Sequence, residues 1–176
     1  MRVTRELYAV DGWGVGEIVL ADGVVLAHEL PGQVRGGQPA SEVAPRLRAD
    51  AVRTAPLPPG EDVAALVAER VRRHLAGVET DYRDVPLDLS WCTPFQRELA
   101  SALRDVPWGE VVSYGELAAL AGRPGAARAA GTFCARNRFA LLLPCHRVVS
   151  ADGIGGYGTS GVALKRRLLA LEAVRL

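Results

Sequence analysis

Cysteine and histidine are scarce in this chain, which has three of each among its 176 residues. The cysteines, Cys92, Cys134 and Cys145, are odd in number and widely spaced. That pattern argues against a disulfide framework and favours a reducing compartment. The chain also lacks any CxxC, HxxxH or clustered Cys/His spacing, so the sequence predicts no metal site.

Apolar runs long enough to cross a membrane are missing too. No run approaches the ~20 residues that a transmembrane helix requires. The first residues lead into no signal-peptide apolar region followed by a small-residue cleavage site. We therefore expect a cytoplasmic protein that does not contact a membrane. The apolar fraction of 49% is enough for a proper core, and the length allows one ordinary domain or two small ones.

Net charge is low, at +1, but it is unevenly distributed. Residues 1–90 hold 10 Arg and 14 acidic residues, whereas residues 91–176 hold 10 Arg, Lys165 and 6 acidic residues. Basic charge therefore gathers in the second half of the chain, and a polyanionic partner is one explanation. An excess of five charges is also common on protein surfaces. The charge distribution alone therefore does not distinguish a polyanion-binding surface from an ordinary solvated one.

The first half of the chain predicts a small antiparallel sheet and a helix. Residues 6–30 alternate short apolar stretches with Asp11-Gly12 and Asp22-Gly23, and Asp-Gly between β-rich runs is a strong hairpin signal. Residues 31–60 predict an irregular connection with room for one short strand. Residues 61–76 have helical apolar spacing, and the helix is expected to end before the glycine that follows.

The second half predicts mostly helices. Thr93-Pro94-Phe95-Gln96 and Ser113-Tyr114-Gly115-Glu116 are capping boxes. The first helix is expected to extend to about Val106 and the second to end at Gly122. A Gly/Pro turn then leads into a further helix over residues 126–134, and two short helices joined in this way resemble a helix-turn-helix.

These elements divide the chain into an N-terminal α/β domain at residues 1–80, a linker at residues 81–90 and a C-terminal domain at residues 91–176. The expected fold class is α+β.

The helix expected over residues 126–134 has almost no large side chains. Arg128 is the one long side chain among Ala127, Ala129, Ala130 and Gly131. An Ala-rich core helix is the commoner explanation of such a pattern. A helix that reads bases in the major groove should carry several polar side chains. A bare helix instead suits close approach to a nucleic-acid backbone or a minor groove, with one Arg inserted.

Residues 139–143 form an apolar run that leads into Pro144-Cys145-His146-Arg147-Val148. A cysteine is a strong nucleophile as thiolate, and a nearby imidazole or cation promotes that state. A packed core cysteine is the alternative. Neighbours on an extended chain also point to opposite sides, so Cys145 and His146 need not touch.

Taken in order, several motifs of the second half resemble the alkylguanine-DNA alkyltransferases, also called methylated-DNA–protein-cysteine methyltransferases. The resemblance covers roughly residues 91–174 and is carried by an ordered set that is far more specific than its pieces. The set is Thr93-Pro94-Phe95-Gln96, Val106-Pro107-Trp108-Gly109-Glu110, Ser113-Tyr114-Gly115-Glu116-Leu117-Ala118, Ala127-Arg128-Ala129-Ala130-Gly131, Asn137, Pro144-Cys145-His146-Arg147-Val148-Val149, Gly156-Tyr157-Gly158 and Leu164-Lys165-Arg166-Arg167-Leu168-Leu169-Ala170-Leu171-Glu172.

The resemblance implies an N-terminal RNase H-like domain and a mostly helical catalytic domain with a winged helix-turn-helix. It implies direct repair of double-stranded DNA bearing guanine alkylated at O6, and also of O4-alkylthymine. The protein would bind the minor groove as a monomer, flip the damaged nucleotide into its pocket and act once without a cofactor. Cooperative binding on DNA stays open.

Residue by residue, the resemblance makes Cys145 the alkyl acceptor, His146 the base that deprotonates it through a water, and Glu172 the acid that orients the His. A Cys-His-acid relay raises thiolate content by the logic of catalytic triads. Tyr114 would help rotate the nucleotide out and donate a proton to the leaving guanine. Its alternative is an aromatic side chain that packs on the core.

On the DNA side, Arg128 corresponds to the finger that fills the vacated stack and Asn137 to the hinge of the recognition helix. Other matched positions on the helix that would approach DNA are Ala127, Ala129 and Gly131. The loop at residues 157–161 would close over the base. Residues matched to substrate binding are Val148, Tyr157 and Ser160, with the carbonyls of Cys145 and Val148 facing the exocyclic amine.

The chain departs from the family pattern at Arg138, where the family usually has Pro, and at Leu99-Ala100, where it usually has Val-Trp. The N-terminal zinc ligands of some members have no counterpart, and Cys92 and Cys134 are expected in the core.

Two alternative functions stay open. One is a non-enzymatic alkyltransferase-like protein that binds lesions, although such proteins usually lack Cys at the acceptor position. The other is a Cys-His hydrolase, which would need an oxyanion hole and would turn over.

Overall fold

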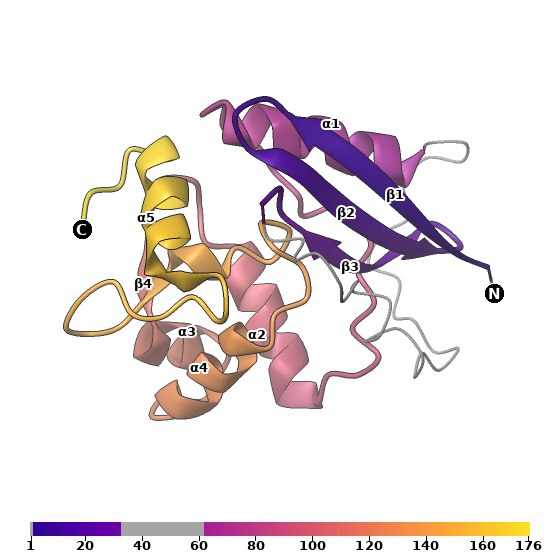
Figure 1. Cartoon of the computed structure of the whole chain (residues 1–176). Helices are drawn as coiled ribbons and strands as arrows, with labels where there is room; N and C mark the ends of the chain where they lie inside the picture. Colours follow the sequence, from indigo (N-terminus) through magenta and orange to yellow (C-terminus); the bar gives the residue numbers. More distant parts are fainter. Residues whose placement is uncertain (1, 33–61) are drawn as a thin grey trace. The chain divides into compact units, whose positions relative to one another are not determined.

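The computed structural model describes residues 2–32 and 62–176, whose helices and strands are labelled in Figure 1. The chain divides into two compact units. The first unit comprises Met1–Arg72, Asp81–Trp91 and Arg138–Leu142, and the second comprises Arg73–Thr80, Cys92–Asn137 and Leu143–Leu176. The expected irregular connection at residues 31–60 lies almost wholly outside the described residues. Within the described ranges, no helix has the length and apolar character to cross a membrane.

The first unit is built on a three-stranded antiparallel sheet of order β1-β2-β3, with strands Val3–Val10, Gly14–Ala21 and Val24–Glu29. Asp22 and Gly23 both have positive φ, 49° and 78°, which is the conformation that a tight hairpin between twisted strands requires. The hairpin prediction is therefore confirmed. Most of β2 and β3 is buried, and Val19, Ala21, Leu26 and Ala27 form a core cluster.

Helix α1 comprises Val63–Leu75. The Asp62 carboxylate accepts hydrogen bonds from the N–H groups of Ala64 and Ala65 at 3.0 and 3.2 Å, which caps the helix start. Gly77, with φ 79°, donates its N–H to His74 O at 2.9 Å and closes the end, as expected for a C-terminal glycine.

The segment expected to be a linker, residues 81–90, is instead a packed part of the first unit. Val85 and Leu87 are at most 1% exposed. Val25 donates its N–H to Pro86 O at 2.9 Å and accepts from Asp88 N at 2.8 Å. The apolar side chains of this segment explain the difference, since each adds buried area that a solvated linker would leave in water. The units therefore do not follow the expected bounds at 80 and 91.

The second unit is mostly helical, with α2 at Pro94–Arg104, α3 at Tyr114–Leu120, α4 at Ala127–Ala135 and α5 at Gly161–Leu171. Both predicted capping boxes are present in full, at Thr93 with Gln96 and at Ser113 with Glu116. Strands β4, Val112–Ser113, and β5, Val148–Val149, form a short parallel pair. The 3-10 turn η3, Cys145–Arg147, precedes β5 directly. Helix α2 ends two residues earlier than expected, where Asp105 caps it.

Candidate active site

Cys145 begins the turn η3 at the end of a buried apolar run and is itself only 8% exposed. Asn137, just beyond α4, donates from its Nδ2 to the Cys145 Sγ at 3.0 Å and to the Leu143 carbonyl at 2.8 Å. The side chain of Asn137 therefore joins the end of α4 to the segment that carries the thiol. This contact accounts for an Asn at a position that sequence reasoning matched to a hinge.

The thiol is protonated at rest. Burial raises the pKa of Cys145, and it outweighs the Asn137 hydrogen bond, the Lys165 cation and a hydrogen bond from Tyr157, which all lower it. We expected the neighbouring His and Arg to favour thiolate, and this expectation was wrong for the resting protein. The reason is desolvation, which penalises a charged sulfur more than these partners stabilise it. A base is therefore needed to remove the proton during reaction.

Glu172 caps the end of α5, and its side chain is fully buried among donors. Its Oε1 lies 2.7 Å from His146 Nε2, and its Oε2 accepts from Arg147 Nε at 2.9 Å. Gly109 donates its N–H to Oε2 at 3.2 Å, from a backbone with φ 78° that favours glycine. Although burial raises the pKa of Glu172, these donors hold it well below its ordinary value, so the carboxylate stays ionised.

His146 is a neutral base at physiological pH. Burial lowers its pKa to about 4, against the opposing effect of Glu172. Because the carboxylate accepts from Nε2–H, the lone pair of the neutral ring is on Nδ1. That atom is buried and has no hydrogen-bond partner among the described residues. Among the described residues, no hydrogen bond joins the imidazole directly to the thiol. The structure therefore brings His146 and Glu172 into contact, while Cys145 precedes His146 on η3 without bonding to its ring.

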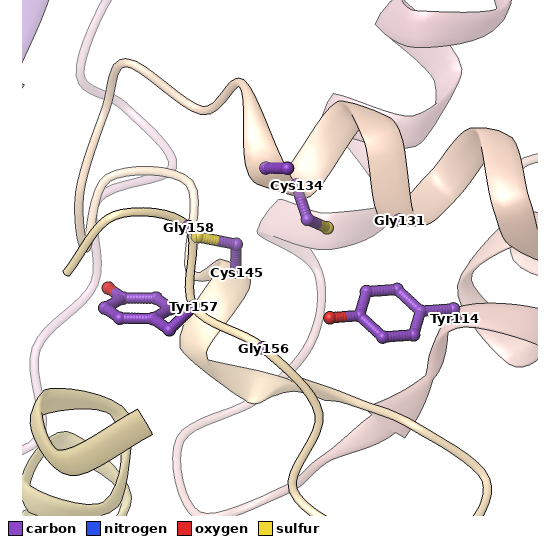
Figure 2. Close-up of a pocket in the computed structure, with 8 residues that line it drawn as sticks. Tyr114, Gly131, Cys134, Cys145, Gly156, Tyr157 and Gly158 are labelled. Atoms are coloured by element: carbon purple, nitrogen blue, oxygen red, sulfur yellow. The ribbon is translucent and has the colours of Figure 1, made fainter. Parts of the chain in front are cut away.

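A cavity of about 80 Å³ opens onto the thiol. It is lined by Tyr114, Gly131, Cys134, Ala135, Cys145, Gly156, Tyr157 and Gly158. Figure 2 shows the Tyr114 hydroxyl directed toward the segment that carries Cys145, with Tyr157 on the other side of the thiol. Burial raises the pKa of both tyrosines, so each hydroxyl keeps its proton and can donate it.

The remaining predicted site residues lie outside this cavity. Arg128 and Ala129 are exposed on α4, and Ala127 is partly exposed at its start. The Val148 carbonyl, expected to face an exocyclic amine, accepts from Lys165 Nζ at 2.6 Å. Ser160 is exposed before α5 and is not among the eight described residues that line the cavity.

Three residues of the site were missed by sequence reasoning. Cys134 was expected in the core, but it is partly exposed and lines the cavity beside Cys145, because the last turn of α4 faces the thiol. Lys165, the only lysine of the chain, is buried on α5 and donates to the carbonyls of Val148, Ile154 and Gly156. His74 is fully buried beside Glu172. Lys165 and His74 both lie on the apolar faces of their helices. A polar residue on an apolar helix face was the sequence signal that could have identified them.

The donor atoms of His74, His146 and Glu172 lie within 4.8 Å of one another, a spacing that a metal ion could bridge. The prediction of no metal site rested on sequence spacing, which cannot see this cluster. Arg147 donates to both oxygens of the same carboxylate, at 2.9 and 3.1 Å. A second cation on that carboxylate would face the guanidinium, so the donor set is better matched to a hydrogen-bonded relay.

The site thus combines a buried thiol on η3 with a His146–Glu172 pair, in a helical unit whose helix α4 exposes Arg128, and this combination can be compared with known protein families. The family model described as "6-O-methylguanine DNA methyltransferase, DNA binding domain" matches residues 94–174. That range contains every one of the predicted site residues.

Whole-chain comparison extends this match. The chain is similar to the O6-methylguanine methyltransferase of Mycobacterium tuberculosis, with 32% identity, a TM-score of 0.71 and coverage of 98% of this chain and 95% of that one. A structure of the Mycobacterium tuberculosis protein in complex with DNA matches with 30% identity, a TM-score of 0.67 and coverage of 96% and 92%. The chain therefore belongs to the O6-methylguanine methyltransferase family.

Among curated proteins, the chain is 41% identical over 108 residues to the methylated-DNA–protein-cysteine methyltransferase of Methanothermobacter thermautotrophicus. The match covers 61% of this chain and 60% of that protein. The chain thus spans about three fifths of the length of this relative. The mixed α/β fold, with a small antiparallel sheet and helices, is that of the family.

Proposed function

We propose that this protein repairs DNA by transferring the alkyl group of O6-alkylguanine to its own Cys145, once per molecule. The observation that carries the proposal is the protonated, buried thiol, which lines a cavity next to a neutral His146 held by an ionised Glu172. A thiol of this kind is inert until a base removes its proton. Nucleophilic attack is thereby confined to a substrate that enters the cavity.

In the proposed reaction, His146 Nδ1 accepts the thiol proton through a water, and the sulfur attacks the alkyl carbon. The carbon–O6 bond breaks as the sulfur–carbon bond forms. The electron pair leaves on the guanine, which takes a proton from the Tyr114 hydroxyl. The Tyr114 phenolate then regains a proton from solvent, and His146 releases to solvent the proton that it accepted from the thiol, so the protons balance. The product is unmodified guanine and a thioether on Cys145. No group in the proposed scheme restores the thiol, so the protein would be consumed.

O6 of guanine lies on the major-groove edge of the base pair, where a protein bound to the minor groove cannot reach it. We therefore further propose that the base is flipped out of the stack while the protein holds the minor groove. Arg128, exposed on the bare helix α4, would occupy the vacated position. Helices α3 and α4 would act as the winged helix-turn-helix, and the sheet of the first unit as part of an RNase H-like domain. O4-alkylthymine would be a second substrate.

Mass spectrometry tests the acceptor directly. After mixing with duplex DNA that contains O6-methylguanine, the intact protein should gain one methyl group, and the peptide that holds Cys145 should carry it. Cys145→Ser should bind the DNA without gaining mass. Cys134→Ser is the matched control, since it removes the other thiol of the cavity and should still be methylated. Methyl on Cys134, turnover, or binding without transfer would refute the proposal.

A further inference from the structure

His74 is a fully buried histidine in the last turn of α1, on a segment that belongs to the second unit. Its Nε2 lies 3.2 Å from Glu172 Oε1, the same oxygen that lies 2.7 Å from His146 Nε2. Its ring also stands edge-on to the His146 ring, with centroids 5.8 Å apart and planes at 72°. One histidine thus touches both members of the proposed relay.

We propose that His74 is a positioning residue of the relay, which fixes Glu172 Oε1 and holds the His146 ring in the orientation that directs Nδ1 away from the carboxylate. This inference rests on the proposed function. His74 itself is held in turn by Trp108, whose ring centroid lies 4.6 Å away. It would not contact the substrate or the sulfur.

The orientation of His146 needs such support because the ring has few hydrogen bonds of its own. Its Nε2 has the Glu172 contact, and its Nδ1 has no hydrogen-bond partner among the described residues. A flipped imidazole would present Cε1 to the carboxylate and move the basic lone pair away from its working position. The edge contact from His74, with the ring centroids 5.8 Å apart, would oppose such a flip. A packed ring can fix a rotamer in this way.

Removal of His74 should also change the protonation of His146. The groups that act on the protonation of His146 are Glu172, which raises its pKa, and His74 and Arg147, which lower it alongside burial. Removal of His74 therefore takes away one lowering influence and loosens the burial. The His146 ring should then be protonated at a higher pH, and a protonated ring cannot accept the thiol proton.

The experiment is a single-turnover methyl-transfer series from pH 4 to 8, with the rate read from the mass of the Cys145 peptide. His74→Ala should slow transfer at neutral pH by about tenfold. It should also move the acid limb of the profile upward by about one pH unit. His74→Gln keeps an N–H donor at the position of Nε2 and should recover most of the rate, so it serves if His74→Ala folds poorly. His28→Gln, a buried histidine of the first unit, should lower stability without moving the acid limb.

Wild-type protein that takes up no methyl group would refute the proposed function, and the role of His74 with it. Wild-type and His74→Ala proteins that react equally over the whole pH range would refute the role of His74 alone. An equal shift of the acid limb in His28→Gln would do the same. If one equivalent of Zn²⁺ raised the melting temperature of the wild type and slowed transfer, but did neither in His74→Ala, the cluster would be a metal centre and the proposal would fall.

Discussion

Replacement of Glu172 by Gln should damage both the stability of the second unit and its chemistry. Four hydrogen-bond contacts converge on this carboxylate, from His146 Nε2, Gly109 N and two nitrogens of Arg147. In addition, His74 Nε2 lies 3.2 Å from Oε1. A Gln side chain keeps one acceptor oxygen and turns an NH₂ group toward the remaining donors. The Arg147 side chain is only 7% exposed, so its charge would lose its buried partner.

The size of the effect follows from this loss. Breaking a buried ion pair by removing one partner costs about 3–5 kcal/mol, which for a chain of this length lowers the melting temperature by roughly 10 °C. Loss of the orienting anion should also slow methyl transfer by about 100-fold or more. Thermal unfolding and single-turnover transfer on duplex DNA with O6-methylguanine measure the two losses separately.

The matched control is Glu116→Gln, because Glu116 is an exposed carboxylate that completes a capping box and has no contact with the relay. It should cost about 1 kcal/mol or less and leave the transfer rate unchanged. If Glu172→Gln unfolded like the wild type and reacted at the wild-type rate, the assignment of Glu172 as the anchor of His146 and Arg147 would be wrong.

Three further predictions follow from individual side chains. Arg128→Ala should slow repair about tenfold more on duplex than on single-stranded DNA, because only a duplex leaves a vacated stack to fill; equal losses on both would indicate simple charge neutralisation. Lys165→Met should destabilise the protein by about 2–4 kcal/mol, since three carbonyls lose a charged donor, and should slow iodoacetamide labelling of Cys145 by raising its pKa further; faster labelling would contradict this. Burial lowers the pKa of His28 to about 4, so the unfolded chain binds a proton that the fold excludes between pH 6.5 and 4. Stability should therefore fall by about 3 kcal/mol across that window, and His28→Gln should reduce the fall in urea-unfolding series; an unchanged fall would refute the assignment.

Local sequence alone was sufficient for the elements that local chemistry specifies. The Asp22-Gly23 hairpin was predictable because few residue pairs adopt positive φ at both positions. The capping boxes at Thr93 and Ser113 were predictable because each side chain bonds a backbone group three residues away. The ordered motifs around Cys145 likewise led to the family before any contact was known.

The protonation of Cys145 and the set of side chains around it were decided by the tertiary structure. Residues next to Cys145 in sequence suggested a thiolate, but burial leaves a thiol, and desolvation depends on the whole fold. Cys134 faces the cavity because of the direction in which α4 ends. His74 is 98 residues before Glu172 in the sequence, and no local pattern relates the two. Only the packing of α1 residues 73–75 into the second unit brings that imidazole to the carboxylate, because contacts between distant segments depend on the assembled core rather than on sequence spacing.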